Sequence, residues 1–486
     1  MSVLSNLEPK NVFSFFEKIC SIPHGSGNIE QISNYLVEFA KERNLTVIQD
    51  EIKNVIIIKE ATPGYENEPA VILQGHMDMV AVKKPGYDID MKTEGLRVAV
   101  DGDNIYAEGT SLGGDDGIAV AYALALLDSD TIKHPRLEVV ITVDEEVGMD
   151  GAFAIDLSML KGNRLLNLDS EDEGIFLTSC AGGARAWVKL PVELSDAEGT
   201  LVTLTIDGLL GGHSGAEIHH ERGNSNCLMG RVLWNLQQKA PIQLVSLNGG
   251  LADNAIPRKT DAEILIPADS LNVLDEVLED LSKNIAQELA TKDPEFVLEW
   301  QKGSEKVSRK AVSVKDTAQV AGLLIGMPNG VQNMSADVKG LVETSLNMGM
   351  LNLKAEEAVV EAVFAVRSSV ESAKEALLQK LEALAVMAGG SCLVTGSYPG
   401  WVYRVDSPLR DKMIAVYKEM YGVEPKVEAI HAGLECGILG SKITDLDCVS
   451  IGPDMKDIHT TEERLSIAST KRVWEYLVKL LEQKEA

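Results

Sequence analysis

Histidine and carboxylate side chains recur at the ends of apolar segments along this chain. Gly75-His76-Met77-Asp78 follows the apolar run from Ala70 to Leu73, which predicts a buried strand. Two residues apart at a strand end, His76 and Asp78 can present an imidazole and a carboxylate to one point. The same residue types stand further along the chain at Asp115, Glu145-Glu146, Asp169 and His459. Imidazole and carboxylate groups bind divalent metals, so the pattern predicts a centre for a pair of ions such as zinc.

Taken singly, each of these positions also has a structural explanation. His76 and Asp78 could cap a strand end, and Glu145-Glu146 could be two solvated glutamates. A hydrolytic centre with two metals needs a bridging carboxylate, terminal ligands and a base for water. Asp115 is the candidate bridge, because its glycine neighbours allow a carboxylate to approach two ions, and Asp116 is expected to support the turn.

The pair Glu145-Glu146 follows the apolar run Leu137–Val143, and adjacent residues of an extended chain point in opposite directions. One glutamate is therefore expected to bind metal, while the other acts as acid and base toward water and substrate. Asp78 is expected to accept the ring N–H of His76 and so fix its tautomer.

The composition excludes several classes of protein. The 486 residues are 45% hydrophobic, which argues against disorder, and the net charge of −29 argues against a nucleic-acid or anionic-membrane partner. No apolar run reaches the roughly 18 residues of a membrane span. The six cysteines are scattered without a CxxC motif, and residues 1–9 lack a secretory signal, so a reducing, cytoplasmic location is expected.

Strand-like and helical segments alternate in residues 1–184, which predicts an α/β sheet with crossover connections. The pattern of residues changes between 185 and 388. There, segments 262–289 and 360–387 each predict a strand, a turn and an acidic amphipathic helix. The pattern of residues 1–184 returns in residues 389–486. We therefore expect a mixed-sheet catalytic domain, residues 1–184 and 389–486, interrupted by an internally doubled α/β lid domain, residues 185–388. A chance repeat is the alternative, because strand-turn-helix units are common.

The inserted region carries polar residues of a different kind. His213 lies in the glycine-rich loop Gly211–Gly215, where an imidazole could donate to a developing oxyanion or simply bond to its own backbone. Asn254, Asn347 and Arg367 could hold a substrate carboxylate, which arginine can bind in a bidentate manner. Each of the three could equally be a surface residue.

These motifs resemble those of the co-catalytic zinc peptidase family that includes aminoacylases, carboxypeptidase G-type enzymes and succinyl-diaminopimelate desuccinylase. The matching segments are Gly75–Val80, Gly113–Gly117, Glu145–Ala152 and Asn167–Ser170. Further segments resemble the branch of this family that cleaves Xaa-His dipeptides: Cys180–Gly183, Gly211–His219, Asn254–Arg258, Tyr398–Trp401 and His431–Gly437. The resemblance spans nearly the whole chain and implies a di-zinc peptidase fold with a lid.

The resemblance also implies how the ligands divide between the metals. His76 and Asp169 would bind one ion, Glu146 and His459 would bind the other, and Asp115 would bridge the two. The implied cofactors are two divalent ions per chain, with zinc first and cobalt or manganese as alternatives.

The remaining implied roles concern the reaction. Glu145 would take the proton from the attacking water and return it to the leaving amine, and Asp78 would orient His76. His213 would polarise the scissile carbonyl from the lid. The residues implied to lie near the substrate are Asn254, Asn347, Arg367 and Glu435.

Two positions depart from the family pattern. Asp144 stands before the glutamate pair, where the family has a small or hydroxyl residue, and it adds charge beside the base. The last ligand reads His459-Thr460-Thr461-Glu462, where the family has His-Ser-Pro-Asp/Glu. The loop therefore lacks the stiffening proline, which puts retention of the metal at His459 in question.

The expected function is metal-dependent hydrolysis of small dipeptides, with Xaa-His dipeptides such as carnosine as the first candidates. An N-acyl amino-acid amidohydrolase or a broad-specificity aminopeptidase would use the same metals. A non-catalytic peptide-binding protein is the alternative from another class, and the retention of all five ligands and Glu145 argues against it. A homodimer stays open, because single-lid relatives pair through the lid whereas a doubled lid could fill that role within one chain.

Overall fold

The computed structural model describes residues 3–485, which form two compact units. The first unit takes in the chain up to Ser179, Tyr403–Ala429 and the chain from Leu434 onward. The second unit consists of Cys180–Val402 and Ile430–Gly433. Each unit is built around its own hydrophobic core.

A mixed eight-stranded sheet forms the centre of the first unit. Its middle strands are runs of valine, isoleucine and leucine buried on both faces, as expected for strands that have helices on either side. β3 pairs in parallel with β6 and β7, and β7 pairs in parallel with β21. The strand order is β1 (Thr46–Gln49), β2 (Val55–Lys59), β6 (Leu137–Thr142), β3 (Val71–His76), β7 (Arg164–Asn167), β21 (Asp447–Ser450), β8 (Ile175–Cys180) and β20 (Lys426–Ile430).

Helix α3 (Gly114–Asp128) is the most deeply buried helix segment of this unit. Every side chain from Ile118 to Leu127 is at most 3% exposed, because the segment has no polar face. Asp115 and Asp116, at the start of this element, have non-helical backbone angles and lead directly into the buried helical segment, so a rigid core element holds this turn. The other helices of the unit are α1 (Lys10–Cys20), α2 (Glu30–Glu42), α4 (Glu145–Gly148), α5 (Asp150–Ala154), α10 (Pro408–Tyr421), α11 (Glu435–Lys442) and α12 (Ile467–Glu482).

A small four-stranded sheet completes the first unit. Its order is β22 (Met455–Lys456), β23 (Arg464–Ser466), β5 (Asn104–Ala107) and β4 (Val98–Asp101). β22 and β23 are an antiparallel pair, and the loop between them carries His459.

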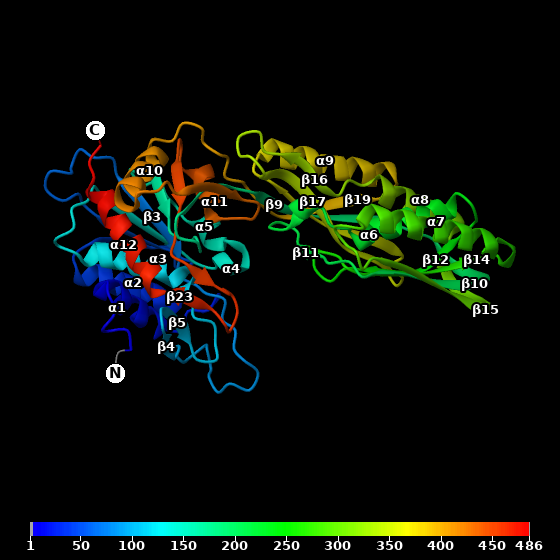
Figure 1. Ribbon diagram of the computed structural model, residues 1–486, viewed down its shortest axis with the longest axis horizontal. Coiled ribbons are helices and arrows are strands. Elements are labelled where there is room, and N and C mark those ends of the chain that lie inside the picture. The colour runs from blue at the N-terminus through cyan, green and yellow to red at the C-terminus, as the bar shows by residue number, and fades with distance from the viewer. Residues whose placement is uncertain (1–2, 486) are drawn as a thin grey trace. The chain divides into compact units, whose positions relative to one another are not determined.

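The second unit is a nine-stranded sheet whose resolved pairings are all antiparallel. Figure 1 shows its four helices along one face of the sheet: α6 (Ser225–Gln237), α7 (Leu271–Leu289), α8 (Val314–Gly326) and α9 (Glu371–Met387). The strand order is β15 (Val297–Val312), β10 (Leu194–Asp207), β14 (Thr260–Ile266), β12 (Gln243–Gly249), β17 (Val342–Lys354), β18 (Val359–Ser368), β9 (Gly182–Pro191) and β19 (Ser391–Tyr398), and β16 (Gly330–Met334) pairs with β17. A separate short pair joins β11 (Gly212–His213) to β13 (Ala255–Ile256).

The mixed α/β fold class predicted from the sequence is confirmed. The two strand-then-helix segments predicted in the inserted region are present as β14 with α7 and β18 with α9. All six cysteines are free thiols. None of the helices between residues 3 and 485 has the length and apolar content needed to cross a bilayer.

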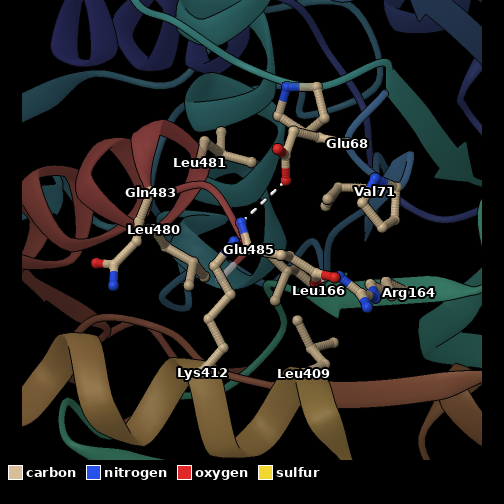
Figure 2. A pocket seen from close by; sticks show the side chains of 12 residues that line it. Glu68, Val71, Arg164, Leu166, Leu409, Lys412, Leu480, Leu481, Gln483 and Glu485 are labelled. Carbon is tan, nitrogen blue, oxygen red and sulfur yellow. Dashed lines mark hydrogen bonds and ion pairs between the residues drawn. The ribbon is translucent and has the colours of Figure 1, made fainter. Parts of the chain in front are cut away.

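Residues between Leu480 and Glu485 help to line a small pocket at the amino ends of β3 and β7 (Figure 2). Glu485 forms an ion pair with Arg164, and its backbone N–H donates to Glu68 Oε2 at 3.0 Å. Lys412 lines the same pocket, and burial together with the nearby Arg164 lowers the pKa of its ammonium group. The Glu485 carboxylate therefore balances the Arg164 guanidinium in a pocket that Lys412 also lines.

We expect Glu485→Ala to lower the free energy of unfolding by about 1 kcal/mol, the upper range for a partly exposed ion pair. Urea denaturation measures this change. Glu475→Ala is the matched control, because Glu475 pairs with Lys471 at 3.8 Å on the exposed side of α12. The control should change stability by less than about 0.5 kcal/mol. Equal losses of stability in the two variants would show that the ion pair between Glu485 and Arg164 contributes no more than an exposed ion pair.

Candidate metal centre

Three neighbouring parallel strands bring the predicted ligands to one edge of the central sheet. His76 is the last residue of β3, Asp169 comes two residues after β7, and Glu145 and Glu146 follow β6 after a two-residue turn. The carboxyl ends of parallel strands meet at the same edge, which is where ligand sites of α/β sheets form. Asp115 arrives at this edge from the non-helical first residues of α3, and His459 arrives from the β22–β23 loop.

Asp115 lies between the two histidines. Its Oδ1 is 3.1 Å from His76 Nε2, and its Oδ2 is 3.1 Å from His459 Nε2. On one side, His76 Nε2 also lies 3.7 Å from Asp169 Oδ1. On the other side, His459 Nε2 lies 3.0 Å from Glu146 Oε1. The five side chains thus form two imidazole–carboxylate pairs that share one carboxylate.

The donor set and its charge fit two divalent cations. Among residues 3–485, no lysine or arginine forms an ion pair with the carboxylates of Asp78, Asp115, Asp169, Glu145 or Glu146. Single ligand atoms of His76, Asp115 and Glu146 lie within 4.8 Å of one another, as do those of His76, Asp116 and Asp169. Carboxylates that are buried without a lysine or arginine partner are costly, and divalent metals held by nitrogen and oxygen ligands would offset that cost.

Protons occupy the imidazoles when no metal neutralises the acids. Burial opposes protonation of His76, but hydrogen bonds to Asp115, Asp169 and Asp78 raise its pKa well above the usual value. Hydrogen bonds to Asp115 and Glu146 raise the pKa of His459 to about 10. Burial raises the pKa of Asp169 to about 7. A metal must displace the imidazole protons, so metal affinity should rise with pH.

Asp78 contacts both His76 and Glu145. Its carboxylate lies 3.4 Å from His76 Nδ1, while its backbone carbonyl is the nearer acceptor at 3.0 Å. The same carboxylate accepts the Glu145 N–H at 3.1 Å and the Ser26 hydroxyl at 2.8 Å. The predicted orienting contact is therefore accompanied by a second one, which fixes the start of the segment carrying Glu145.

The expectation of extended backbone at the glutamate pair is wrong. Glu145 and Glu146 begin the short helix α4, because Asp144 turns the chain in the left-handed region at φ 54°. The two side chains therefore diverge by roughly 100°, the angle between successive residues of a helix, and not by 180°. Burial raises the pKa of Glu145 well above its ordinary value.

Asp144 and the His459 loop, the two departures from the family pattern, both form local hydrogen bonds. Asp144 Oδ1 accepts the Gly27 N–H at 2.6 Å, so this carboxylate is committed to a neighbouring loop. In the His459 loop, the Thr460 hydroxyl donates to the Asp457 carbonyl at 2.7 Å and accepts the Glu462 N–H at 3.1 Å. These bonds brace the turn from which proline is missing.

Glu435 lies beneath the strand ends that carry the ligands. It is fully buried, and its Oε2 accepts from Gln74 Nε2 at 2.5 Å and from Thr142 Oγ1 at 2.6 Å. Gln74 in turn accepts from Asn167 Nδ2 at 2.6 Å. Gln74, Thr142 and Asn167 belong to β3, β6 and β7, so this polar row ties the three strands together. Sequence reasoning missed the row, because polar residues inside strands give no local signal of one another.

The polar residues of the second unit form their own cluster around Gly215. A β-carbon on Gly215 would lie 3.0 Å from the His213 ring and 3.2 Å from Arg367 Nε. His213 Nδ1 accepts the N–H groups of Gly215 at 3.2 Å and Ala216 at 3.0 Å, so the neutral ring carries its proton on Nε2. Burial and the nearby Arg367 lower the pKa of His213, which favours this neutral form.

Asn347 and Asn254 are placed differently within this cluster. Asn347 is buried, and its amide donates to the carbonyls of Asp253 at 3.1 Å and Ala255 at 2.8 Å and accepts from Asn224 at 3.0 Å. Asn347 therefore holds the turn on which Asn254 lies exposed. Arg367 Nη1 donates to the Tyr398 hydroxyl at 3.2 Å, while its Nε has no partner in the described structure.

Comparison with known proteins identifies the family. Residues 72–483 match the model of peptidase family M20/M25/M40. The chain is 37% identical over 485 residues, 99% of each chain, to the cytosol non-specific dipeptidase of Escherichia coli K12. It is 37% identical to the aminoacylhistidine dipeptidase of Vibrio alginolyticus, whose crystal structure superposes with a TM-score of 0.93 and covers 100% of this chain and 99% of that one. The aminopeptidase PepT of Bacillus cereus, at 15% identity, TM-score 0.55 and 98% coverage of both chains, shares the fold.

The chain therefore belongs to peptidase family M20/M25/M40 and is a peptide hydrolase. The family resemblance predicted from the sequence motifs is confirmed. The matched region begins within β3 and runs to Gln483, the residue that follows α12.

Proposed function

We propose that this chain is a dipeptidase that hydrolyses its substrate with two divalent metals. The main observation in support is the position of Asp115. Its two oxygens each face a different imidazole, and one further carboxylate lies beside each ring. Asp115 would bridge the ions, His76 and Asp169 would hold one, and His459 and Glu146 the other. When bound, the metals would polarise the scissile carbonyl and lower the pKa of the attacking water.

The chain's own residues supply the proton transfers. Glu145 would accept the proton of the attacking water and deliver it to the leaving amine, because it follows β6 at the sheet edge where the ligands gather. Asp78 would hold Glu145 and His76 in position relative to each other through its contacts to both. The polar row of Glu435, Gln74 and Thr142 would hold the strand ends rigid during the reaction.

We propose that the second unit serves as the lid and binds the substrate carboxylate. Arg367 offers an unpartnered Nε, and a planar guanidinium can bind a carboxylate in a bidentate manner. Asn254 would contribute from its exposed turn, and Asn347 would act by holding that turn. A recognised carboxyl terminus would limit the length of peptide that the site accepts.

The relatives' names leave open how narrow the specificity is. One is described as non-specific and the other as acting on aminoacylhistidines. We propose Xaa-His dipeptides as preferred substrates within a broader range of dipeptides, with zinc as the metal and the cytoplasm as the location. The six free thiols suit a reducing compartment.

The test is a substrate panel on the purified chain, stripped with a chelator and reloaded with zinc, cobalt or manganese. Dipeptides with and without C-terminal histidine, a tripeptide and N-acetyl amino acids are compared by kcat/KM. Hydrolysis of dipeptides that stops on metal removal and returns with metal supports the proposal. Turnover of only the N-acetyl amino acids would replace it with an amidohydrolase. Peptide binding without any turnover in the metal-loaded protein would indicate a non-catalytic homologue.

We expect His213→Asn to lower kcat by about 10²- to 10³-fold while KM changes little, the range for losing one oxyanion donor. Asparagine can still accept the N–H groups of Gly215 and Ala216, so it keeps the loop braced but lacks the donor at Nε2. His213→Ala removes both functions and is compared by steady-state kinetics. If His213 only braces its loop, the asparagine variant will retain wild-type kcat.

A further inference from the structure

The loop between β22 and β23 carries a second buried group besides His459. Glu463 is 3% exposed, although it lies between Glu462, which reaches solvent, and the start of β23. The side chain of Glu462 is 56% exposed and pairs with Lys84 at 2.6 Å. Two adjacent glutamates of one loop therefore have opposite environments.

Glu463 binds the turn that presents Asp115. Its Oε2 accepts the N–H groups of Leu112 at 2.7 Å and Gly113 at 3.1 Å, and its Oε1 accepts the N–H of Gly114 at 2.8 Å. Gly114 immediately precedes Asp115. The turn reaches this geometry with Gly113 at φ 68°, a conformation that favours glycine.

The loop between β22 and β23 thus contacts both Asp115 and the three residues before it. The His459 ring lies 3.1 Å from Asp115 Oδ2, and the Glu463 carboxylate binds the backbone of the three residues before Asp115. No other carboxylate among the described residues accepts three backbone N–H groups from this turn. The contacts join the segments that carry Asp115 and His459, which lie more than 300 residues apart in the sequence.

We propose that Glu463 is a positioning residue that sets the distance between Asp115 and His459 and so determines the affinity of the metal ion held between them. The proposal rests on the metal centre of the proposed function. Contacts that orient a metal ligand without touching the metal typically contribute about 10- to 100-fold to metal affinity or activity, so a loss of that size is expected when the contact is broken.

Glu463→Gln breaks the contact with little change of shape. A glutamine amide has one oxygen and one NH₂ group, so the NH₂ must face at least one of three backbone donors. That mismatch leaves a buried N–H without an acceptor, which the turn can relieve only by moving. Gly114→Ala perturbs the same contact from the opposite side, because its β-carbon would lie 3.2 Å from Glu463 Oε1.

In the experiment, the metal-free wild type, Glu463→Gln and Glu462→Gln are titrated with Zn²⁺ and Co²⁺. Binding is measured by calorimetry and by the visible absorption of bound Co²⁺. We expect Glu463→Gln to bind one ion as the wild type does and the other about 10- to 100-fold more weakly. Saturating metal should restore most of kcat, with KM for a dipeptide unchanged. Glu462→Gln, the neighbouring matched control, should titrate as the wild type does.

A purely structural role would lower the melting temperature of the metal-free protein and leave both metal affinities unchanged, which would overturn the proposal. Equal losses in the Glu462 and Glu463 variants would also overturn it. If Glu463→Gln does not fold, as judged by circular dichroism, Gly114→Ala carries the same test, and wild-type affinity for both ions in that variant is the contrary result. A wild-type chain that takes up fewer than two ions refutes the proposed metal centre instead, which separates the two failures.

Discussion

Replacing Glu145 by glutamine is expected to lower kcat by about 10²- to 10⁴-fold while both metals stay bound, the range for losing a general acid–base group. Glutamine keeps the size of the side chain, and the backbone N–H of residue 145 still donates to Asp78. The glutamine side chain cannot take a proton from water. Steady-state kinetics on a dipeptide, together with elemental analysis of the same sample, measures both parts of the prediction.

Asp150→Asn is the control for this experiment, because Asp150 is an exposed acid at the start of the next helix, α5. It should retain wild-type kinetics. Near wild-type turnover in Glu145→Gln at full metal occupancy would remove Glu145 from the proposed role and point to another acid at the same sheet edge.

Asp115→Ala is expected to abolish activity and to release at least one metal ion per chain. It removes the side chain whose two oxygens lie 3.1 Å from His76 Nε2 and from His459 Nε2, so two cations would be left without a shared anion between them. Elemental analysis after gel filtration measures the stoichiometry, and circular dichroism checks that the sheets remain folded.

The matched control is Asp128→Asn at the opposite end of the same helix, α3, where the carboxylate pairs with Arg43 at 2.7 Å. It should bind metals as the wild type does. Two ions per chain in Asp115→Ala would mean that the bridge lies elsewhere, with Asp116 as the next candidate because it is the neighbouring carboxylate near His76 and Asp169.

The sequence predicted the elements that carry the ligands because their signals are local. An apolar run followed by a histidine or a carboxylate marks a strand end, and β3 and β6 lie where those runs predicted them. The glycines around Asp115 predicted its turn for the same reason. The glutamate pair was misjudged, because nothing in Asp144 itself indicates that it turns the chain in the left-handed region.

Amphipathic patterning also predicted α7 and α9 of the second unit, but not its longest strand. β15 runs over 16 residues, and most of its side chains are exposed. Its segment is polar and lacks the alternation that marks a half-buried strand. Pairing with β10 makes it a strand, and that pairing is a long-range contact that the local sequence does not encode.

Which residue types could bind metal and which segments present them were determined by the sequence itself, since side-chain chemistry and hydrophobic periodicity are properties of short stretches. The division of the ligands into two pairs around Asp115 depends on the parallel order of β6, β3 and β7 and on a hairpin loop more than 300 residues away. The same holds for Glu463, which no spacing distinguishes from Glu462. Only the tertiary structure decided that one of these glutamates binds the Asp115 turn and the other faces water, because burial is set by distant parts of the chain that pack together.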